Sequence, residues 1–405
     1  MEWKLKDLTV DGKGSYGIGA PAVPYQEDKL TYLRITDIND DGSLNFSDLK
    51  SVDAEDAEKY ILKENDIVFA RTGNSTGRSY FYEKQHGTFV YAGFLIKFSL
   101  DPNKVNPRIL KYYTHSKPYF DWVNSFDTGA TRGNINAKTY GDMEIELPSR
   151  KVQDKIVSIL SSLDRKIELN NKINADLEEM AQAIFKNWFV DFEPFKDGKF
   201  VNSELGMIPE GWKVGRLDEI ADVVGGSTPS KAKPEYYTQK GIAWLTPKDL
   251  SNHPAVYSSR GEIDITEEGY NSTSTKLMPK GTVLFTSRAP IGYISIAQND
   301  ICTNQGFKSV VPKKAGTCFL YCFLKYVTPE IENKSTGSTF KEASGALMKS
   351  LQVIMPEQKV FEDFEEIVCP LFARIESLEK ENSRLSLLRD TLIPRLMSGE
   401  LEDPE

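Results

Sequence analysis

The most constraining feature of this chain is an internal repeat with an offset near 208 residues. Residues 128–131 (TGAT) recur at that offset as residues 336–339 (TGST). Residues 143–148 (MEIELP), an alternating apolar stretch closed by proline, recur in the same way as residues 351–356 (LQVIMP). Because the matches keep both offset and order, chance does not explain them, and the chain is predicted to use one structural plan twice.

Earlier matches extend the repeat toward the N-terminus. They pair WKLKDL at Trp3 with WKVGRL at Trp212, residues 32–38 with 244–250, and residues 66–69 with 282–285. Each copy begins with a segment of short β-type runs, such as residues 66–70, 89–96 and 282–285, between loops rich in Gly, Asn, Ser and Thr. Each copy ends in a helical pattern. This organisation predicts an α/β (α+β) fold of two globular domains with two long helices.

The domain boundaries follow from these patterns. We expect a first domain at 1–149, a central helical region at 150–190, a linker at 191–211, a second domain at 212–356, a distal helical region at 357–399 and an acidic tail at 400–405. The linker is rich in Gly, Pro and charge and returns the chain to the start of the second copy.

Both helical regions carry a heptad seam, with apolar residues stepping by alternating four and three. From Ile156 to Trp188 the first seam spans 33 residues, or about 50 Å of helix. A stripe this long and narrow favours antiparallel pairing with the helix of the other copy, and the alternative is two ordinary core helices of a bundle. The residues expected to pair are Leu163, Ile167, Asn174, Leu177, Leu371, Ile375, Leu378, Asn382 and Leu385.

Asparagine and proline mark special positions in these helices. Asn174 and Asn382 stand at the same place in the two copies, where a buried amide would fix the register of pairing. Pro370 is expected to start or kink the second helix, and Pro394 to end it.

The net charge of −9 is unevenly distributed. Residues 67–132 hold 9 Lys/Arg against 4 Asp/Glu, and residues 212–356 hold 17 against 13, whereas the chain from residue 360 onward holds 5 against 12. Because binding depends on local charge, the acidic total does not exclude DNA as a partner.

No catalytic motif is present. The chain lacks a phosphate-binding G-x-x-x-x-G-K-[ST] loop, the Asn/Asp-Pro-Pro-aromatic motif of amino-methyltransferases, H-E-x-x-H and G-x-S-x-G. The fragment PEQK at residues 356–359 could resemble part of a nuclease centre, but its counterpart PSRK at 148–151 has no carboxylate. We therefore expect a chain that binds rather than catalyses, with no catalytic residue.

The four cysteines, Cys302, Cys318, Cys322 and Cys369, form no C-x-x-C pair, and the chain has three histidines. Buried or free thiols are expected, and no metal site. No apolar run reaches the roughly 20 residues needed to cross a bilayer. The N-terminus has no apolar stretch of the signal-peptide kind, so a cytoplasmic protein with no membrane partner is expected.

Polar loops after the matched strands offer the chemistry that recognises DNA. Arginine can donate two hydrogen bonds to guanine, asparagine or glutamine can pair with adenine, and small hydroxyls reach phosphates. The candidate DNA-binding residues are Arg71, Thr72, Asn74, Ser75, Arg78, Thr131, Arg132, Asn134, Thr286, Ser287, Arg288, Asn304, Gln305, Lys308, Thr339 and Lys341. Solvated turns are the alternative for any single one of them. A duplicated recognition domain suits a target that is itself in two parts.

Taken together, these features resemble the specificity subunits of type I restriction–modification systems, over essentially the whole chain. The helical regions carry the resemblance, above all IFKNWFVDF at 184–192 and TLIPRLMSGEL at 391–401, together with TNQGF at 303–307. Family members commonly have Glu-Gln at the start of each conserved helix. Here the distal motif is PEQK, but the central one is PSRKVQDK, with Gln153 further along.

The resemblance implies two target recognition domains, each recognising one half of a bipartite double-stranded DNA sequence. It implies that the helices pair antiparallel and set the gap between the two halves. Two modification subunits would methylate adenine at N6 with S-adenosylmethionine, and two restriction subunits would use ATP and Mg to translocate and cleave DNA. No cofactor would be bound by this chain itself.

Two other functions stay open on the sequence. One is a non-catalytic coiled-coil adaptor that joins two protein-binding domains, whose binding would depend little on salt. The other is a self-contained nuclease or methyltransferase, which would need a catalytic motif that the chain does not show.

Overall fold

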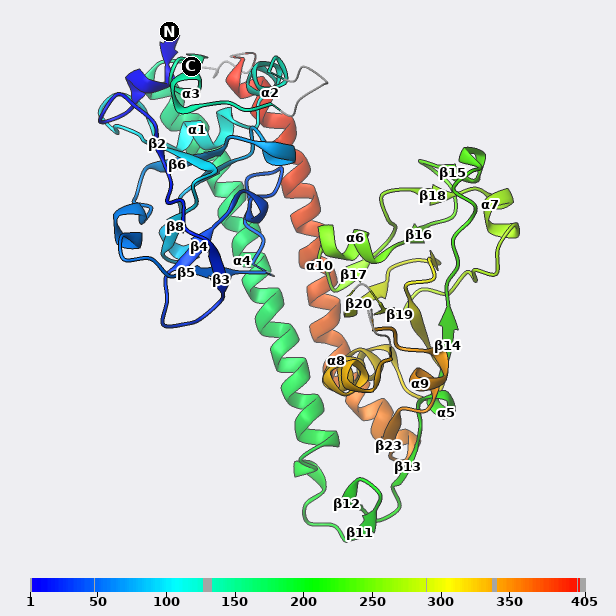
Figure 1. Cartoon of the computed structure of the whole chain (residues 1–405). Coiled ribbons are helices and arrows are strands. Elements are labelled where there is room, and N and C mark those ends of the chain that lie inside the picture. Colours follow the sequence, from blue (N-terminus) through cyan, green and yellow to red (C-terminus); the bar gives the residue numbers. More distant parts are fainter. Residues whose placement is uncertain are drawn as a thin grey trace. The chain divides into compact units, whose positions relative to one another are not determined.

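The structure is a computed structural model that describes residues 2–46, 48–126, 133–288, 290–336, 341–398 and 400. It divides into two compact units, which we call unit 1 (Met1–Ile167 with Arg384–Glu405) and unit 2 (Glu168–Ser383). Two long helices, α4 (Arg150–Phe189) and α10 (Gln358–Met397), contribute to both units (Figure 1). The domain boundaries expected from the sequence, which treat these helices as separate regions, stay predictions.

Unit 1 is built on two four-stranded sheets and one strand pair. The first sheet has the order β2 (Ser15–Tyr16), β9 (Leu95–Ser99), β6 (Asp66–Ala70), β7 (Ser79–Phe81). The second has the order β3 (Ala22–Pro24), β5 (Lys50–Val52), β4 (Thr31–Leu33), β8 (Phe89–Tyr91), and the pair is β1 (Glu2–Lys4) with β10 (Glu144–Glu146). Its shorter helices are α1 (Arg108–Tyr113), α2 (Lys117–Asn124) and α3 (Ala137–Gly141), with single 3-10 turns at Leu5–Leu8, Ile35–Asp37, Ala57–Tyr60, Gly73–Ser75 and Lys84–His86.

Unit 2 contains a five-stranded sheet in the order β14 (Ala221–Gly225), β22 (Lys308–Pro312), β19 (Val283–Ser287), β20 (Ile291–Ala297), β17 (Tyr257–Ser258). Unit 2 also contains two-stranded pairs: β13 (Lys213–Arg216) with β23 (Gln352–Met355), β15 (Tyr237–Thr238) with β18 (Asp264–Ile265), β16 (Trp244–Leu245) with β21 (Cys302–Thr303), and β11 (Phe200–Ser203) with β12 (Gly206–Pro209). The shorter helices are α5 (Leu217–Ile220), α6 (Pro247–Asn252), α7 (Glu267–Asn271), α8 (Thr317–Lys334) and α9 (Gly345–Lys349), with 3-10 turns at Glu193–Phe195 and Pro234–Tyr236.

The predicted repeat is confirmed strand by strand. The first strand of each copy pairs antiparallel with the last, β1 with β10 and β13 with β23. The sheet order β2-β9-β6-β7 of unit 1 recurs as β14-β22-β19-β20 in unit 2. The parallel pair β4–β8 recurs as β16–β21. The chain therefore folds one mixed α/β plan twice.

The two long helices pack on each other within both units. In unit 1, Leu160 of α4 and Ile393 of α10 lie in one buried core, and Asp164 forms an ion pair with Arg389 at 3.2 Å. In unit 2, Asn170 donates a hydrogen bond to Asn382 at 2.8 Å, and the rings of Phe189 and Phe364 lie 5.1 Å apart. Rising residue numbers on α4 thus meet falling numbers on α10, which is the antiparallel pairing expected.

All nine residues expected in the helix seam are buried or half-buried. The asparagine pairing differs in detail from the simple match of the two copies. Asn382 accepts a hydrogen bond from Asn170 and donates one to Asn171 at 2.7 Å. The Oδ1 atom of Asn174 is buried and has no hydrogen-bond partner among the described residues. In an antiparallel pair, residue numbers rise along one helix while they fall along the other. Positions that are equivalent in the two copies, such as Asn174 and Asn382, therefore need not face each other.

Two local expectations are wrong: Pro394 does not end helix α10, and residues 89–96 do not form one strand. Pro370 does not start the helix, and the kink expected there as the alternative stays a prediction. Helix α10 begins at Gln358 and runs through both Pro370 and Pro394 to Met397. A proline removes one helical hydrogen bond, but buried residues beside each proline, such as Val368 and Ile393, hold the helix against its core.

Residues 89–96 form two strands, β8 and β9, in two different sheets, because a turn in which Leu95 donates to the Ala92 carbonyl at 2.8 Å separates them. The segment expected as a linker, 191–211, contains the β11–β12 hairpin. Phe192 and Phe195 pack on Trp212 there, with ring centroids 5.8 and 4.7 Å away.

Candidate nucleic-acid interface

In unit 1, the loop that follows β6 is joined by backbone hydrogen bonds to two other segments. The Arg71 N–H donates to the Phe94 carbonyl at 3.1 Å, and the Ile135 N–H donates to the Arg71 carbonyl at 3.0 Å. The Thr76 hydroxyl donates to the Gly133 carbonyl at 2.9 Å. These bonds gather three polar segments from distant parts of the sequence into one surface, which we call loop cluster 1.

Unit 2 has the same backbone frame at the end of β19. The Ser287 N–H donates to the Gly306 carbonyl at 2.7 Å, and the Ala343 N–H donates to the Ser287 carbonyl at 2.9 Å. Ala343 stands 208 residues after Ile135, so the frame obeys the offset of the repeat. We call this second surface loop cluster 2.

Arg71 is the cation of loop cluster 1 that is best placed to meet an anion or a base. Its guanidinium lies 5.1 Å from the centre of the Tyr16 ring, a cation–π arrangement that orients it. The Tyr16 hydroxyl in turn accepts a hydrogen bond from the Ala137 N–H at 3.1 Å. Among the described residues no carboxylate pairs with Arg71, and its Nε is buried without a partner.

The other predicted residues of loop cluster 1 differ in availability. Arg78 is held within the unit, with Nε donating to Asp40 at 2.6 Å and a terminal nitrogen donating to the Ile38 carbonyl at 3.0 Å. Thr72 forms a β-bridge with Asn134. Asn74 and Asn134 are exposed, whereas Ser75 is buried.

Loop cluster 2 carries two cations around one carboxylate. Arg288 and Lys308 each lie 3.5 Å from Glu342, on opposite oxygens. Gln305 is exposed and accepts a hydrogen bond from the Thr228 hydroxyl, and Asn304 Oδ1 accepts one from the Gly306 N–H at 2.8 Å. Lys341 is exposed at the edge of this cluster, where it donates to the Glu332 carbonyl at 3.2 Å.

Two predicted contact residues are misplaced for DNA. Thr286 and Ser287 are fully buried. The Thr286 hydroxyl donates to the Pro290 carbonyl at 2.8 Å, and the Ser287 hydroxyl donates to the Gly306 carbonyl at 3.1 Å. Their hydroxyls hold the loop together and do not reach a phosphate. The predicted contacts Thr131, Arg132 and Thr339 lie outside the described residues.

Sequence reasoning missed Tyr16 and Glu342. Glu342 follows Asn134 by the repeat offset of 208, so an equivalence between the two copies would have identified it. Tyr16 belongs to no motif, and only the fold brings it to Arg71.

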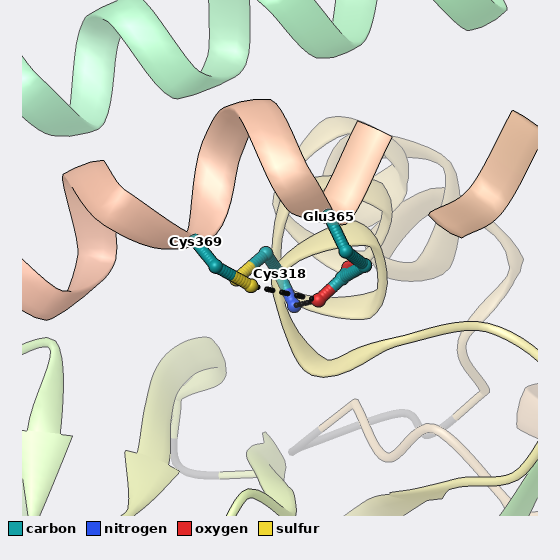
Figure 2. Close-up of side chains that lie close together, drawn as sticks. All are labelled: Cys318, Glu365 and Cys369. Atoms are coloured by element: carbon teal, nitrogen blue, oxygen red, sulfur yellow. Dashed lines mark hydrogen bonds between the residues drawn. The ribbon is translucent and has the colours of Figure 1, made fainter. Parts of the chain in front are cut away.

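A separate cluster joins Cys318 of α8 to Glu365 and Cys369 of α10 (Figure 2). All four cysteines are free, three of them buried, as expected from the sequence. Two of these cysteines are close neighbours, because the Sγ atoms of Cys318 and Cys369 lie 2.8 Å apart.

In the part of the chain that the structure describes, no helix is both long and apolar enough to cross a membrane.

The family model described as the type I restriction modification DNA specificity domain matches residues 16–179 and again residues 209–385. These two matches cover most of both copies of the repeat.

Relatives with reviewed names are similar over part or most of the chain. The specificity subunit of type I restriction enzyme MjaIX from Methanocaldococcus jannaschii is 39% identical over 190 residues, covering 46% of this chain and 44% of the relative. This chain therefore matches less than half of that relative's length. The specificity subunit of type I restriction enzyme HindI from Haemophilus influenzae is 25% identical over 407 residues, covering 85% of this chain and 88% of the relative.

A solved structure supports the fold. The crystal structure of a type I restriction–modification S subunit from M. genitalium superimposes with a TM-score of 0.55 at 18% identity, over 98% of this chain and 96% of that one. The duplicated α/β plan, the antiparallel helices and the double match of the family model agree, and the chain belongs to the family of type I restriction modification DNA specificity domains.

Proposed function

We propose that this chain recognises a bipartite double-stranded DNA target, with loop cluster 1 contacting one half and loop cluster 2 the other. Membership of the family supports a role in DNA sequence specificity within a type I system. The observation that carries the two-part proposal is the shared backbone frame, in which the Arg71–Ile135 and Ser287–Ala343 hydrogen bonds are equivalent. Two equivalent surfaces in one chain suit two half-sites.

The two clusters differ in the chemistry that they offer to a base edge. Arg71 has no carboxylate partner among the described residues, and the donor fork of a guanidinium suits guanine O6 and N7. Arg288 lies beside Glu342, so loop cluster 2 offers a donor and an acceptor together. A carboxylate can accept a hydrogen bond from cytosine N4. The half-sites recognised by the two clusters are therefore expected to differ in sequence.

The chain acts as the non-catalytic subunit of a larger complex. Two modification subunits supply adenine-N6 methylation with S-adenosylmethionine, and two restriction subunits supply ATP- and Mg-dependent cleavage. This assignment rests on the family and on the lack of any catalytic motif in the sequence. Co-expression with the modification subunit should give a stable complex that methylates a split motif, and a chain that never associates with it contradicts the assignment.

DNA binding tests the proposed surfaces directly. In the complex with modification subunits, Arg71→Ala and Arg288→Ala should each weaken binding to the cognate duplex by about 1–3 kcal/mol. The matched control is Arg216→Ala, because Arg216 is exposed, lies on β13 and pairs with Asp218 at 2.6 Å outside both clusters. Equal losses for all three variants would contradict the assignment of the surfaces.

Salt dependence separates this function from a protein-binding adaptor. Affinity for the duplex should fall steeply as salt rises, because bound phosphates release counterions. Binding through these loops that is nearly independent of salt would favour the adaptor.

A further inference from the structure

Three potential ligand atoms converge where α8 meets α10 in unit 2 (Figure 2). Cys318 Sγ lies 2.8 Å from Cys369 Sγ, and Cys369 Sγ lies 3.0 Å from Glu365 Oε2. The three ligand atoms all lie within 4.8 Å of one another. Glu365 and Cys369 are one helical turn apart and point to the same side of α10, and Cys318 comes from the first turn of α8.

The carboxylate of this cluster is held in place by the start of α8. Glu365 Oε1 accepts a hydrogen bond from the Phe319 N–H at 2.7 Å, and Oε2 accepts a longer one from the Cys318 N–H at 3.3 Å. A Cβ at Gly316 would lie 2.1 Å from the Glu365 side chain, so a larger residue there would displace this carboxylate. Oε1 is thus held by the shorter backbone hydrogen bond, whereas Oε2, with the longer one, lies next to the sulfurs and is the oxygen available to a ligand.

Charge balance favours a divalent cation here. Without a cation, the cluster holds two free cysteine thiols beside one carboxylate. If a divalent cation replaces the two thiol protons, the cluster gains two thiolates and two positive charges. Its net charge is unchanged, so the buried site bears no added charge on binding.

We propose that Cys318, Glu365 and Cys369 bind one thiophilic divalent cation, with Zn²⁺ as the representative, through two sulfurs and one carboxylate oxygen. Two S–H bonds break, two sulfur–metal bonds form and two protons leave to solvent. Zinc–sulfur bonds of about 2.3 Å at tetrahedral angles place the sulfurs about 3.8 Å apart. Small rotations of the two cysteine side chains that move their sulfurs about 1 Å further apart would meet that requirement, and a fourth coordination position would stay open to water.

Such an ion would join α8, which belongs to the second recognition domain, to the long helix α10. This site is not visible in the sequence, because Glu365 and Cys369 follow Cys318 by 47 and 51 residues.

Cobalt titration of the full chain tests the site, with Co²⁺ standing in for Zn²⁺ in a phosphine-reduced, thiol-free buffer. One equivalent should bind and produce thiolate-to-cobalt charge-transfer bands, which one equivalent of Zn²⁺ should remove. Cys318→Ser and Cys369→Ser should each abolish the bands, and Glu365→Gln should weaken binding, because a neutral amide replaces one of the three ligands. Cys302→Ser is the matched control, because Cys302 is buried in the same unit but lies outside the cluster.

Two results would overturn the proposal. The first is the absence of thiolate bands, or their equal loss in Cys302→Ser. The second is a Cys318–Cys369 disulfide found by peptide mass mapping of the air-exposed chain under conditions in which Zn²⁺ is present and does not prevent it. If Cys318→Ser does not fold, Cys369→Ser decides, because Cys369 is only half-buried and its replacement disturbs the core less.

Discussion

Replacing Asp164 with alanine is expected to destabilise unit 1, because this buried carboxylate joins three elements. Its oxygens accept hydrogen bonds from Tyr112 at 3.0 Å and Arg389 at 3.2 Å, and Lys111 lies 3.0 Å away. Burial by itself raises the pKa of Asp164, but Lys111 and Arg389 outweigh it, so the pKa lies below its usual range. The carboxylate is therefore ionised and paired in the folded protein.

The magnitude follows from what the variant leaves behind. Removing one partner of a buried ion pair costs about 3–5 kcal/mol. Lys111 also lies 3.6 Å from Glu83, and Arg389 lies 2.9 Å from Asp390, so neither cation would be left without a carboxylate. We therefore expect about 3 kcal/mol, the lower end of that range.

Chemical denaturation measures this loss, and hydrogen exchange of residues 384–397 shows whether it concerns the packing of α10. Asp154→Ala is the matched control, because Asp154 lies on the same helix but is exposed and pairs with Arg150 at 2.9 Å. Exposed pairs contribute less than about 1 kcal/mol. A loss for Asp164→Ala no larger than that for Asp154→Ala would refute the reasoning.

The sign of the pH dependence follows from the lowered pKa. Asp164 binds a proton more readily in the unfolded chain, so its stabilising contribution is present above its unfolded pKa of about 4. That contribution is lost as the pH falls through the lower folded pKa. The difference in stability between the wild-type chain and Asp164→Ala should therefore shrink on acidification below about pH 4.

Two further predictions concern unit 2. Burial raises the pKa of Glu379 to about 7, although hydrogen bonds from the Val256 and Tyr257 N–H groups oppose the shift. The folded protein therefore binds this proton more tightly than the unfolded chain does. The resulting stabilisation should be present below the unfolded pKa of Glu379 and be lost as the pH rises to about 7. Denaturation at a series of pH values should show the stability of the wild-type chain relative to Glu379→Gln falling by about 3 kcal/mol between pH of about 4.5 and 7, and a constant difference would contradict the assigned pKa. Gly226→Ala should cost about 1–3 kcal/mol in the same assay, because a Cβ there would lie 2.2 Å from the Thr303 and Asn304 carbonyls; Gly19→Ala, with nothing within 4 Å, should cost far less, and equal costs would contradict the packing argument.

The repeat was predictable because similar short motifs recur in the same order at a nearly constant offset. Strand β6 lies in the predicted β-type run at 66–70, and strands β10 and β23 lie in the two alternating stretches that proline closes. The long helices were predictable from their seams, since a period of 3.5 residues extends over ten heptad positions in the first. The local rule failed at Pro394, where helix α10 continues to Met397 and the buried Ile393 holds it against the core.

The candidate interface was only partly predictable. The loops were identified from composition. However, the sequence could not distinguish Arg71, which has no carboxylate partner in the described part of the chain, from Arg78, which forms an ion pair with Asp40. The sequence also could not show that the Thr286 hydroxyl donates its hydrogen bond to the Pro290 carbonyl within the same loop. These distinctions depend on contacts between segments that are 38 or more residues apart, or on turns whose geometry a single sequence does not fix.

Mapping methylated adenines in cells that contain this chain and its modification subunit tests two-part recognition most directly. The wild-type chain should give one bipartite motif. Arg71→Ala should relax the base preference in one half of that motif only, and Arg288→Ala in the other half only. A contiguous motif, or relaxation of the same half by both variants, would contradict the conclusion that the two loop clusters recognise separate halves of the target.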